Sequence, residues 1–198
     1  MNTFRFKTYL TGNINTTDAL TQELLSHCNS KTVEKDSFLL REGEQIAHSF
    51  FVESGLLRQY SVDKKGKEHI LQFAPENWFM SNRESEYLGQ PSSYFIQAIE
   101  DSTILIIKKE LIQQLSTSNA GFIDFNNRLL HKHIASLQKR VTQLQSASAK
   151  ERYLDFIKVY PDILLRVPQT YVSSYLGITP ESLSRIRKEL AYEHQSVS

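Results

Sequence analysis

Residues 169–190 constrain this chain more than any other stretch, because they read as two short helices joined by a tight turn. Gly177 stands at the turn, where a positive φ costs glycine little. Ser173 is small at the point where two steeply crossed helices must approach closely. The apolar positions give each helix one face to bury: Val172, Leu176, Ile178, Leu183 and Ile186. The pattern predicts a helix-turn-helix whose second helix has the size to enter a DNA major groove.

The start of the second predicted helix carries strong local signals. Thr179 supplies a capping hydroxyl, Pro180 suits the first helical position, and Glu181 places an acid in the first turn. The polar residues that would then face outward are Thr179, Glu181, Ser182, Arg185 and Lys188. The alternative is an ordinary helical hairpin with a solvated polar face. The combined motif favours DNA binding over that alternative.

Composition places broad limits on the rest of the chain. Its 198 residues suffice for one large or two small domains, and a hydrophobic content of 40% permits a packed core. The single cysteine, Cys28, excludes an intramolecular disulfide framework and an iron–sulfur cluster held by several cysteines of this chain. No apolar run has the length of a membrane span, and the first ten residues lack an apolar signal core. These features predict a cytoplasmic protein.

Charge is distributed unevenly, although the formal net charge is only +1. Residues 1–118 carry 12 basic and 15 acidic side chains, whereas residues 119–198 carry 11 basic and 7 acidic ones. The positive field therefore lies in the half that holds the predicted helix-turn-helix, which is the half expected to approach phosphates.

The middle of the chain has the pattern of short strands. Five segments rich in aromatic and β-branched residues are separated by turn chemistry: Ser49–Val52, Leu56–Val62, Glu68–Phe73, Tyr94–Glu100 and Thr103–Lys108. Residues 53–55 and 63–67 are the clearest turns. This arrangement predicts a small β-barrel or jelly roll. A short helix is expected before it over residues 16–29, with Thr16 or Thr17 as its cap and with Leu20, Leu24 and Leu25 on one face.

Helical periodicity returns at about residue 110 and includes a heptad stripe. The stripe consists of Ile123, Leu130, Ile134, Leu137, Val141 and Leu144. Asn127 fills the missing position, where a polar residue can fix the register of two helices. Packing of this helix onto its own domain is the alternative. A two-fold dimer is favoured, because a helix-turn-helix usually needs a second copy to read two half-sites.

The segment that joins this helix to the helix-turn-helix has its own pattern. Residues 146–150 are small and polar and predict a hinge. A helix is expected over residues 150–160, and Pro161 would stop it. Its predicted buried face consists of Tyr153, Phe156, Ile157 and Tyr160.

A barrel, a long dimerisation helix and a C-terminal helix-turn-helix, in that order, resemble the Crp/Fnr family of bacterial transcription regulators. The stretch GEQIAHSFFVESGLLRQYSVDKKGKEHILQFAPENWF is similar to the first half of that family's cyclic-nucleotide-binding barrel, including Gly55 and the Gly66-Lys67-Glu68 hairpin exit. The tail PQTYVSSYLGITPESLSRIRKEL looks like the short variant common among members from the Bacteroidetes.

The resemblance implies an α+β fold in three parts. A double-stranded β-helix or jelly-roll barrel of the cyclic-nucleotide-binding type would occupy residues 1–118. A dimerisation helix and hinge would occupy residues 119–147, and a winged-helix-like helix-turn-helix domain would occupy residues 148–198. The implied partners are double-stranded DNA and a second copy of the chain. The resemblance also leaves room for RNA polymerase and an unidentified small-molecule effector.

The segment that binds phosphate in nucleotide-binding members departs from the family pattern. Those members carry a Gly-Glu-Leu turn and, about ten residues later, an Arg-Ser-Ala run. Here Asn82 falls at the place of the glutamate and Ser92 at the place of the arginine, while Ser93 retains the serine. Arg83 is the nearby basic residue that could substitute. Without the arginine a buried phosphate lacks its bidentate partner, so we predict no tight binding of cyclic AMP or cyclic GMP.

The helix-turn-helix follows the family pattern more closely. Glu181 and Arg185 fall where the family reads base edges, and these side chains suit a cytosine amino group and a guanine edge. Pro180 replaces a usual base-reading residue, so the target sequence is expected to differ from that of the best-known members. Hydroxyls of Thr170, Thr179 and Ser182 would donate to phosphates. Lys188 and Arg187 are expected to contact phosphate as well.

Enzymatic and metal sites are not expected. His69 is alone on its predicted strand, and His131 and His133 would point about 200° apart on a helix. The sequence has no glycine-rich phosphate loop, nucleophile elbow or spaced carboxylate pair. We therefore expect no catalytic residue, no metal ligand and no certain cofactor. The alternative function is a sensor or interaction module that binds another small ligand or a partner protein without specific DNA binding.

Overall fold

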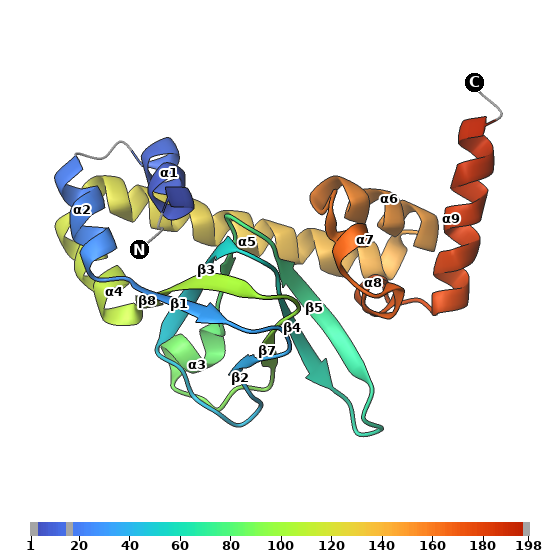
Figure 1. Cartoon of the computed structure of the whole chain (residues 1–198), viewed down its shortest axis with the longest axis horizontal. Coiled ribbons are helices and arrows are strands. Elements are labelled where there is room, and N and C mark those ends of the chain that lie inside the picture. The colour runs from blue at the N-terminus through green and yellow to red at the C-terminus, as the bar shows by residue number, and fades with distance from the viewer. Residues whose placement is uncertain (1–3, 15–17, 196–198) are drawn as a thin grey trace.

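The computed structural model of the chain describes residues 4–14 and 18–195, without the side chains of residues 4, 18–20, 194 and 195. Figure 1 shows a β-barrel, a long helix α5 that passes beside it, and a group of helices at the C-terminal end. The predicted cap at Thr16 or Thr17 and the side chain of Leu20 lie outside the described residues.

Two antiparallel sheets form the barrel. In one sheet the strand order is β1 (Asn29–Val33), β8 (Ser102–Lys108), β3 (His48–Ser54) and β6 (Phe79–Met80). In the other it is β2 (Phe38–Leu40), β7 (Phe95–Ala98), β4 (Leu57–Val62) and β5 (Glu68–Ala74). Apolar side chains from both sheets share one buried core, among them Phe50, Leu57, Ile96 and Ile104. The predicted jelly-roll type of barrel is confirmed.

The predicted turns have the expected geometry. Gly55 links β3 to β4 with φ +96°, and a Cβ there would stand only 2.2 Å from Ser102 Oγ. Glycine is therefore needed for both conformation and space. At the tip of the β4–β5 hairpin, the Gly66 N–H donates to the carbonyl of Asp63 at 2.9 Å. These turns join β3 to β4 and β4 to β5 at the places that the sequence predicted.

Several short elements escaped the sequence analysis. The predicted helix over residues 16–29 is too long, because α2 (Asp18–Ser26) ends early and Asn29 already pairs with β8. The strands β1, β2 and β6 were missed because they are short or largely polar. The helices α1 (Phe4–Asn13) and α3 (Arg83–Leu88) were missed as well. Buried Glu53 accepts the backbone N–H groups of Arg5 and Phe6 at 3.0 and 2.8 Å, which seats α1 on the barrel.

The long helix α5 (Ala120–Ser146) follows α4 (Lys109–Ser118) and has 27 residues. It starts at Asn119, whose side chain accepts the N–H of Phe122 at 2.9 Å. Phe122 and Phe125 are buried in a cluster with residues of α1, β3 and α4. The first turns of α5 are thus fixed on the barrel side of the molecule, while the rest extends toward the C-terminal helices (Figure 1).

The C-terminal part consists of α6 (Ala149–Val159), α7 (Ile163–Arg166), α8 (Gln169–Leu176) and α9 (Pro180–Gln195). The predicted helix at 150–160 is confirmed, with Tyr153, Phe156 and Tyr160 buried and Ile157 partly buried. These helices share one buried cluster with the barrel, in which Phe73 of β5 contacts the rings of Tyr160 and Tyr175. The barrel and the C-terminal helices are therefore packed together in this structure.

Candidate nucleic-acid interface

The helix-turn-helix formed by α8 and α9 has the geometry that the sequence predicted. Gly177 ends α8 in the left-handed conformation with φ +67°. The N–H of Ile178 donates to the carbonyl of Ser173 at 3.0 Å, which closes the turn. Ser173 and Leu183 are buried between the two helices. Gly177 thus has the positive φ that the sequence predicted for the turn, and the small Ser173 is buried.

The start of α9 is capped by its own hydroxyls. Thr179 Oγ1 accepts the N–H of Ser182 at 3.2 Å and lies 3.2 Å from Ser182 Oγ. The pKa of exposed Glu181 lies below its usual value because its own N–H and the Thr179 hydroxyl donate to the carboxylate. Glu181 is therefore ionised at neutral pH and can act only as an acceptor.

The outer face of α9 is open to solvent. A shallow hollow on it is lined by Pro180, Glu181, Ser184, Arg185 and Lys188. Ser184 was missed by the sequence analysis, although its spacing from Glu181 and Lys188 places it on the same helical face. Of the other predicted contacts, Thr170 is exposed at the start of α8, while Ser182 is partly buried and turned toward Thr179.

The positive charges on α9 remain available. Lys150 of α6 forms ion pairs with Glu189 and Glu193 on the C-terminal half of α9, at 3.1 and 2.6 Å. Within the described ranges, no ion pair engages Arg185 or Lys188. Both carboxylates at the acidic end of α9 thus share one cation of the same chain. The hollowed face of α9 keeps the Glu181 carboxylate, the Arg185 guanidinium and the Lys188 ammonium group exposed to water.

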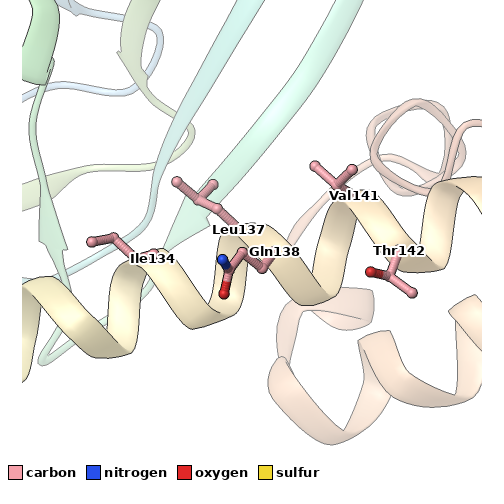
Figure 2. A pocket seen from close by; sticks show the side chains of 5 residues that line it. All are labelled: Ile134, Leu137, Gln138, Val141 and Thr142. Carbon is pink, nitrogen blue, oxygen red and sulfur yellow. The ribbon is translucent and has the colours of Figure 1, made fainter.

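The heptad stripe on α5 is largely uncovered. Ile134, Leu137, Val141 and Leu144 are 47–54% exposed. Figure 2 shows Leu137 and Val141 projecting from one side of the helix, beside a shallow hollow that Gln138 and Thr142 also line. Such a row of large apolar side chains in water is unfavourable unless another surface covers it.

The beginning of the stripe is less exposed. Ile123 and Leu130 are partly buried, whereas Asn127 is exposed. The alternative in which the whole stripe packs on its own domain is contradicted over residues 134–144. In that stretch Lys139, Arg140 and Gln143, which lie off the stripe, bond to the C-terminal helices, and of the stripe only the last residue, Leu144, approaches Gly177.

The predicted ligand positions in the barrel bond to each other. Asn82 and Ser92 are each 2% exposed, and the Asn82 amide donates to Ser92 Oγ. The Asn82 carbonyl oxygen caps α3 by accepting the N–H of Ser85 at 2.9 Å. Ser92 Oγ also accepts the N–H of Tyr94 at 3.0 Å and donates to its carbonyl at 2.8 Å. Both side chains therefore have their hydrogen-bonding partners within this segment.

The other two predicted pocket residues lie at the surface. Arg83 is exposed, with its guanidinium 5.2 Å from the ring of Tyr87, and Ser93 is exposed as well. The structure thus brings together Asn82 and Ser92 but not all four residues. A buried arginine that the sequence analysis missed, Arg58, is bound by Gln97 at 2.9 and 2.6 Å and by Glu68. Its signal was a charged residue inside the apolar strand at 56–62.

Among the described residues, no group of three or more His, Cys, Asp and Glu side chains could hold a metal ion. In the same part of the chain, no helix combines the length and the apolarity needed to cross a bilayer. His131 and His133 are both exposed on α5.

Comparisons with known proteins agree with this architecture. Residues 30–119 match the cyclic nucleotide-binding domain model. An anaerobic regulatory protein of Aggregatibacter actinomycetemcomitans is 24% identical over 167 residues, covering 79% of this chain and 64% of the relative. The fumarate and nitrate reduction regulatory protein of Yersinia pestis is also 24% identical, with coverages of 79% and 66%. The chain thus spans about two thirds of the length of these relatives.

Solved structures share the fold. FixK2 from Bradyrhizobium japonicum superposes with a TM-score of 0.70 at 18% identity, covering 84% of this chain and 86% of that one. A structure from Eubacterium rectale, described as a transcriptional regulator of the Crp/Fnr family, has a TM-score of 0.66 at 19% identity, with coverages of 94% and 88%. The relatives found by sequence are named as regulatory proteins rather than as enzymes.

Proposed function

We propose that this chain, which belongs to the Crp/Fnr family of transcription regulators, works as a homodimer that reads a two-half-site DNA operator through α9. The observation that carries the proposal is the outer face of α9. There Glu181, Arg185 and Lys188 are exposed on a helix whose opposite face is buried against α8. A helix held in this way can enter a major groove with its polar side chains forward.

Each side chain on this face has a distinct role in the proposal. Glu181 accepts a hydrogen bond from a cytosine amino group, and Arg185 donates a fork to a guanine edge. Lys188 and Thr170 bind backbone phosphates and so fix the position of α9 without reading sequence. Thr179 and Ser182 chiefly cap α9, and their hydroxyls approach phosphate from that position.

The exposed stripe on α5 supports the homodimer. Its β-branched residues, Ile134 and Val141, alternate with Leu137 and Leu144 in the heptad. β-Branched residues at one core position and leucine at the other favour a coiled coil of two parallel helices. The exposed Asn127 would then pair near the two-fold axis and fix the register. A parallel pair places both copies of α9 at the same end of the dimer, as two half-sites require.

In this proposal the three parts of the chain divide the work. The barrel at 1–118 responds to signals, the helix and hinge at 119–147 join two copies, and residues 148–198 bind DNA in the cytoplasm. RNA polymerase and a small-molecule effector are the further partners. The barrel does not bind cyclic AMP or cyclic GMP tightly. Asn82 and Ser92 are bonded to each other, and Ser92 stands where nucleotide-binding members have the arginine that binds the phosphate.

The test is a selection of bound duplexes from a random library with the full chain, followed by anisotropy titrations of the selected duplex at several salt concentrations. We expect two related half-sites about one helical turn apart and an affinity that falls steeply with salt. A scrambled duplex of equal length is the control for sequence preference. An absence of enrichment, together with no binding even in dilute buffer, would overturn DNA binding and favour a sensor or interaction module. In calorimetry, cyclic AMP should release no measurable heat.

A further inference from the structure

The junction between α5 and the helix-turn-helix is bridged by side chains, although the main chain leaves the helix there. Ala147 interrupts the helix with ψ 145°, as the small polar segment at 146–150 predicted. Across this break, Lys139 forms an ion pair with Asp155 of α6 at 2.6 Å. Gln143 donates to the same carboxylate at 2.5 Å. Two residues of α5 thus hold α6 by one acidic side chain.

Arg140 forms the second bridge, and it reaches α8 directly. Its guanidinium lies 3.7 Å from the centroid of the Tyr175 ring, and its Nη2 donates to the Tyr175 carbonyl. Arg152 of α6 donates to the neighbouring carbonyl of Leu176 at 3.0 Å. The last carbonyls of a helix are its negative end, so two guanidinium groups there are well placed. The planar guanidinium of arginine can stack on a ring and donate to a carbonyl at the same time, which the compact ammonium group of lysine cannot do.

These contacts begin in the same helical turns as the uncovered stripe. Arg140 lies between Leu137 and Val141, and Leu144 stands one turn further on, with its Cδ2 3.4 Å from the place of a Gly177 Cβ. The side chains that would touch a second copy and those that hold α8 therefore alternate along one short segment.

We infer that Arg140 is the positioning residue that fixes the distance and rotation between the two reading helices of the dimer, and so the spacing of the half-sites. The inference rests on the proposed function. A change of one base pair moves a half-site by about 3.4 Å along the duplex and about 34° around it. A joint held by stacking, a hydrogen bond and an ion pair resists such a movement.

A second attachment joins the helix-turn-helix to the barrel. Arg166 of α7 pairs with Glu76 at 3.0 Å and with Glu100 at 2.5 Å. These residues lie in the barrel and in α7, away from the α5 stripe in the sequence. Together with Ser174 of α8, which accepts the N–H of Ile70 at 3.0 Å and donates to the carbonyl of Glu68 at 2.9 Å, this attachment sets the position of α8 relative to its own barrel. The contacts of Arg140 instead fix the position of α8 relative to α5, and through α5 relative to the second copy.

The experiment measures the affinity of the chain for a series of duplexes. Each duplex carries two copies of the half-site found in the library selection, and the distance between the copies increases by one base pair from one duplex to the next. The unaltered chain should prefer one spacing over its neighbours by about tenfold, which is about 1.4 kcal/mol. With R140Q or D155N the preference should fall to about threefold or less. The base preference within each half-site and the dimer mass should stay unchanged. R140K keeps the charge without the planar stack, so it should broaden the spacing as well.

The matched control is K132Q, which removes one positive charge from an exposed position of the same helix. It should keep the spacing preference of the unaltered chain. D155N removes the carboxylate that binds Lys139 and Gln143 at the same junction. It tests the role of the junction if R140Q fails to fold. Equal spacing preference in the unaltered chain and in the folded joint variants would overturn the inference, as would broadening by R166Q alone. If the unaltered chain binds no duplex, the proposed function itself fails.

Discussion

The segment at residues 82–94 and the outer face of α9 are both rich in polar side chains, yet one is closed on itself and the other is open. Asn82 and Ser92 are buried and have partners within their own segment. Arg185 and Lys188 are exposed, and no ion pair among the described residues engages them. Buried polar groups need hydrogen bonds, whereas exposed ones keep water until a partner replaces it.

The comparison indicates where this chain needs a second molecule. A polar cluster whose donors and acceptors are already paired contributes to stability, but it has few free hydrogen-bonding groups for a ligand. The uncovered stripe on α5 extends the same contrast to apolar groups, because Leu137 and Leu144 are about half exposed while Leu40, Leu57 and Leu105 of the barrel are buried. Substitutions in the exposed stripe and on the exposed face of α9 should have larger effects than substitutions in the closed segment at residues 82–94.

Leu137→Asp should dissociate the proposed dimer. A carboxylate at the centre of the apolar stripe would lose its water without gaining a partner, which costs several kcal/mol. We expect the dimer dissociation constant to rise by about 100-fold or more, measured by sedimentation equilibrium. Ala135→Asp adds the same charge off the stripe and should leave the dimer intact. An unchanged dimer with Asp at 137 would show that the stripe is not the contact surface.

Arg185→Ala should remove sequence preference at one base pair of each half-site. The loss of a bidentate contact to guanine corresponds to about 1–3 kcal/mol of discrimination. Competition titrations with operators altered at single positions would measure it, and salt-sensitive binding should persist. Arg187→Ala is the control, since a phosphate contact should weaken binding to all sequences alike. Equal weakening on all duplexes for Arg185→Ala would contradict base reading.

Asn82→Ala should lower the free energy of unfolding by about 1–2 kcal/mol, because it uncaps α3 and leaves Ser92 without one partner. Urea denaturation would measure the change. Ser93→Ala alters an exposed hydroxyl next to Ser92 and should stay within about 0.5 kcal/mol. If both substitutions were equally mild, the segment would not be the closed structural unit described above.

Glu86→Gln should have the smallest effect and should show it only through pH. Burial raises the pKa of Glu86 above its usual value, although Arg83, the Ser49 hydroxyl and Lys109 act against it and Glu110 adds to it. The folded chain therefore binds this proton more tightly than the unfolded chain. The contribution of Glu86 to the free energy of unfolding is therefore largest below the pKa that this carboxyl has in the unfolded chain. It falls as pH rises through the raised pKa of the folded chain.

The amide of Glu86→Gln cannot ionise, so this variant should lack that part of the fall. Denaturation curves between acidic and neutral pH would show the gap between the two proteins widening in favour of the variant. Glu84→Gln, on the same helix and less buried, is the control. Parallel pH profiles for Glu86→Gln and the unaltered chain would show that the carboxyl is not disfavoured by burial.

Local sequence signals were sufficient for much of the fold. The helix-turn-helix at 169–190, the five central strands and the heptad helix were all predicted, because periodicity and turn chemistry act over a few residues. The short strands β1, β2 and β6 and the helix α1 were not, because their stability depends on neighbours far along the chain. The face of α9 was predicted apart from Ser184.

The sequence by itself determined the type and order of the longer elements, since those follow from spacing, capping and glycine at the turns. Only the tertiary structure decided that Asn82 and Ser92 are bonded to each other, that Arg58 is buried, and that the stripe at 134–144 lies uncovered. It alone joined Arg140 to Tyr175, which lie 35 positions apart. The reason is physical: a side chain's partners are set by chain packing over long separations, which no local pattern encodes.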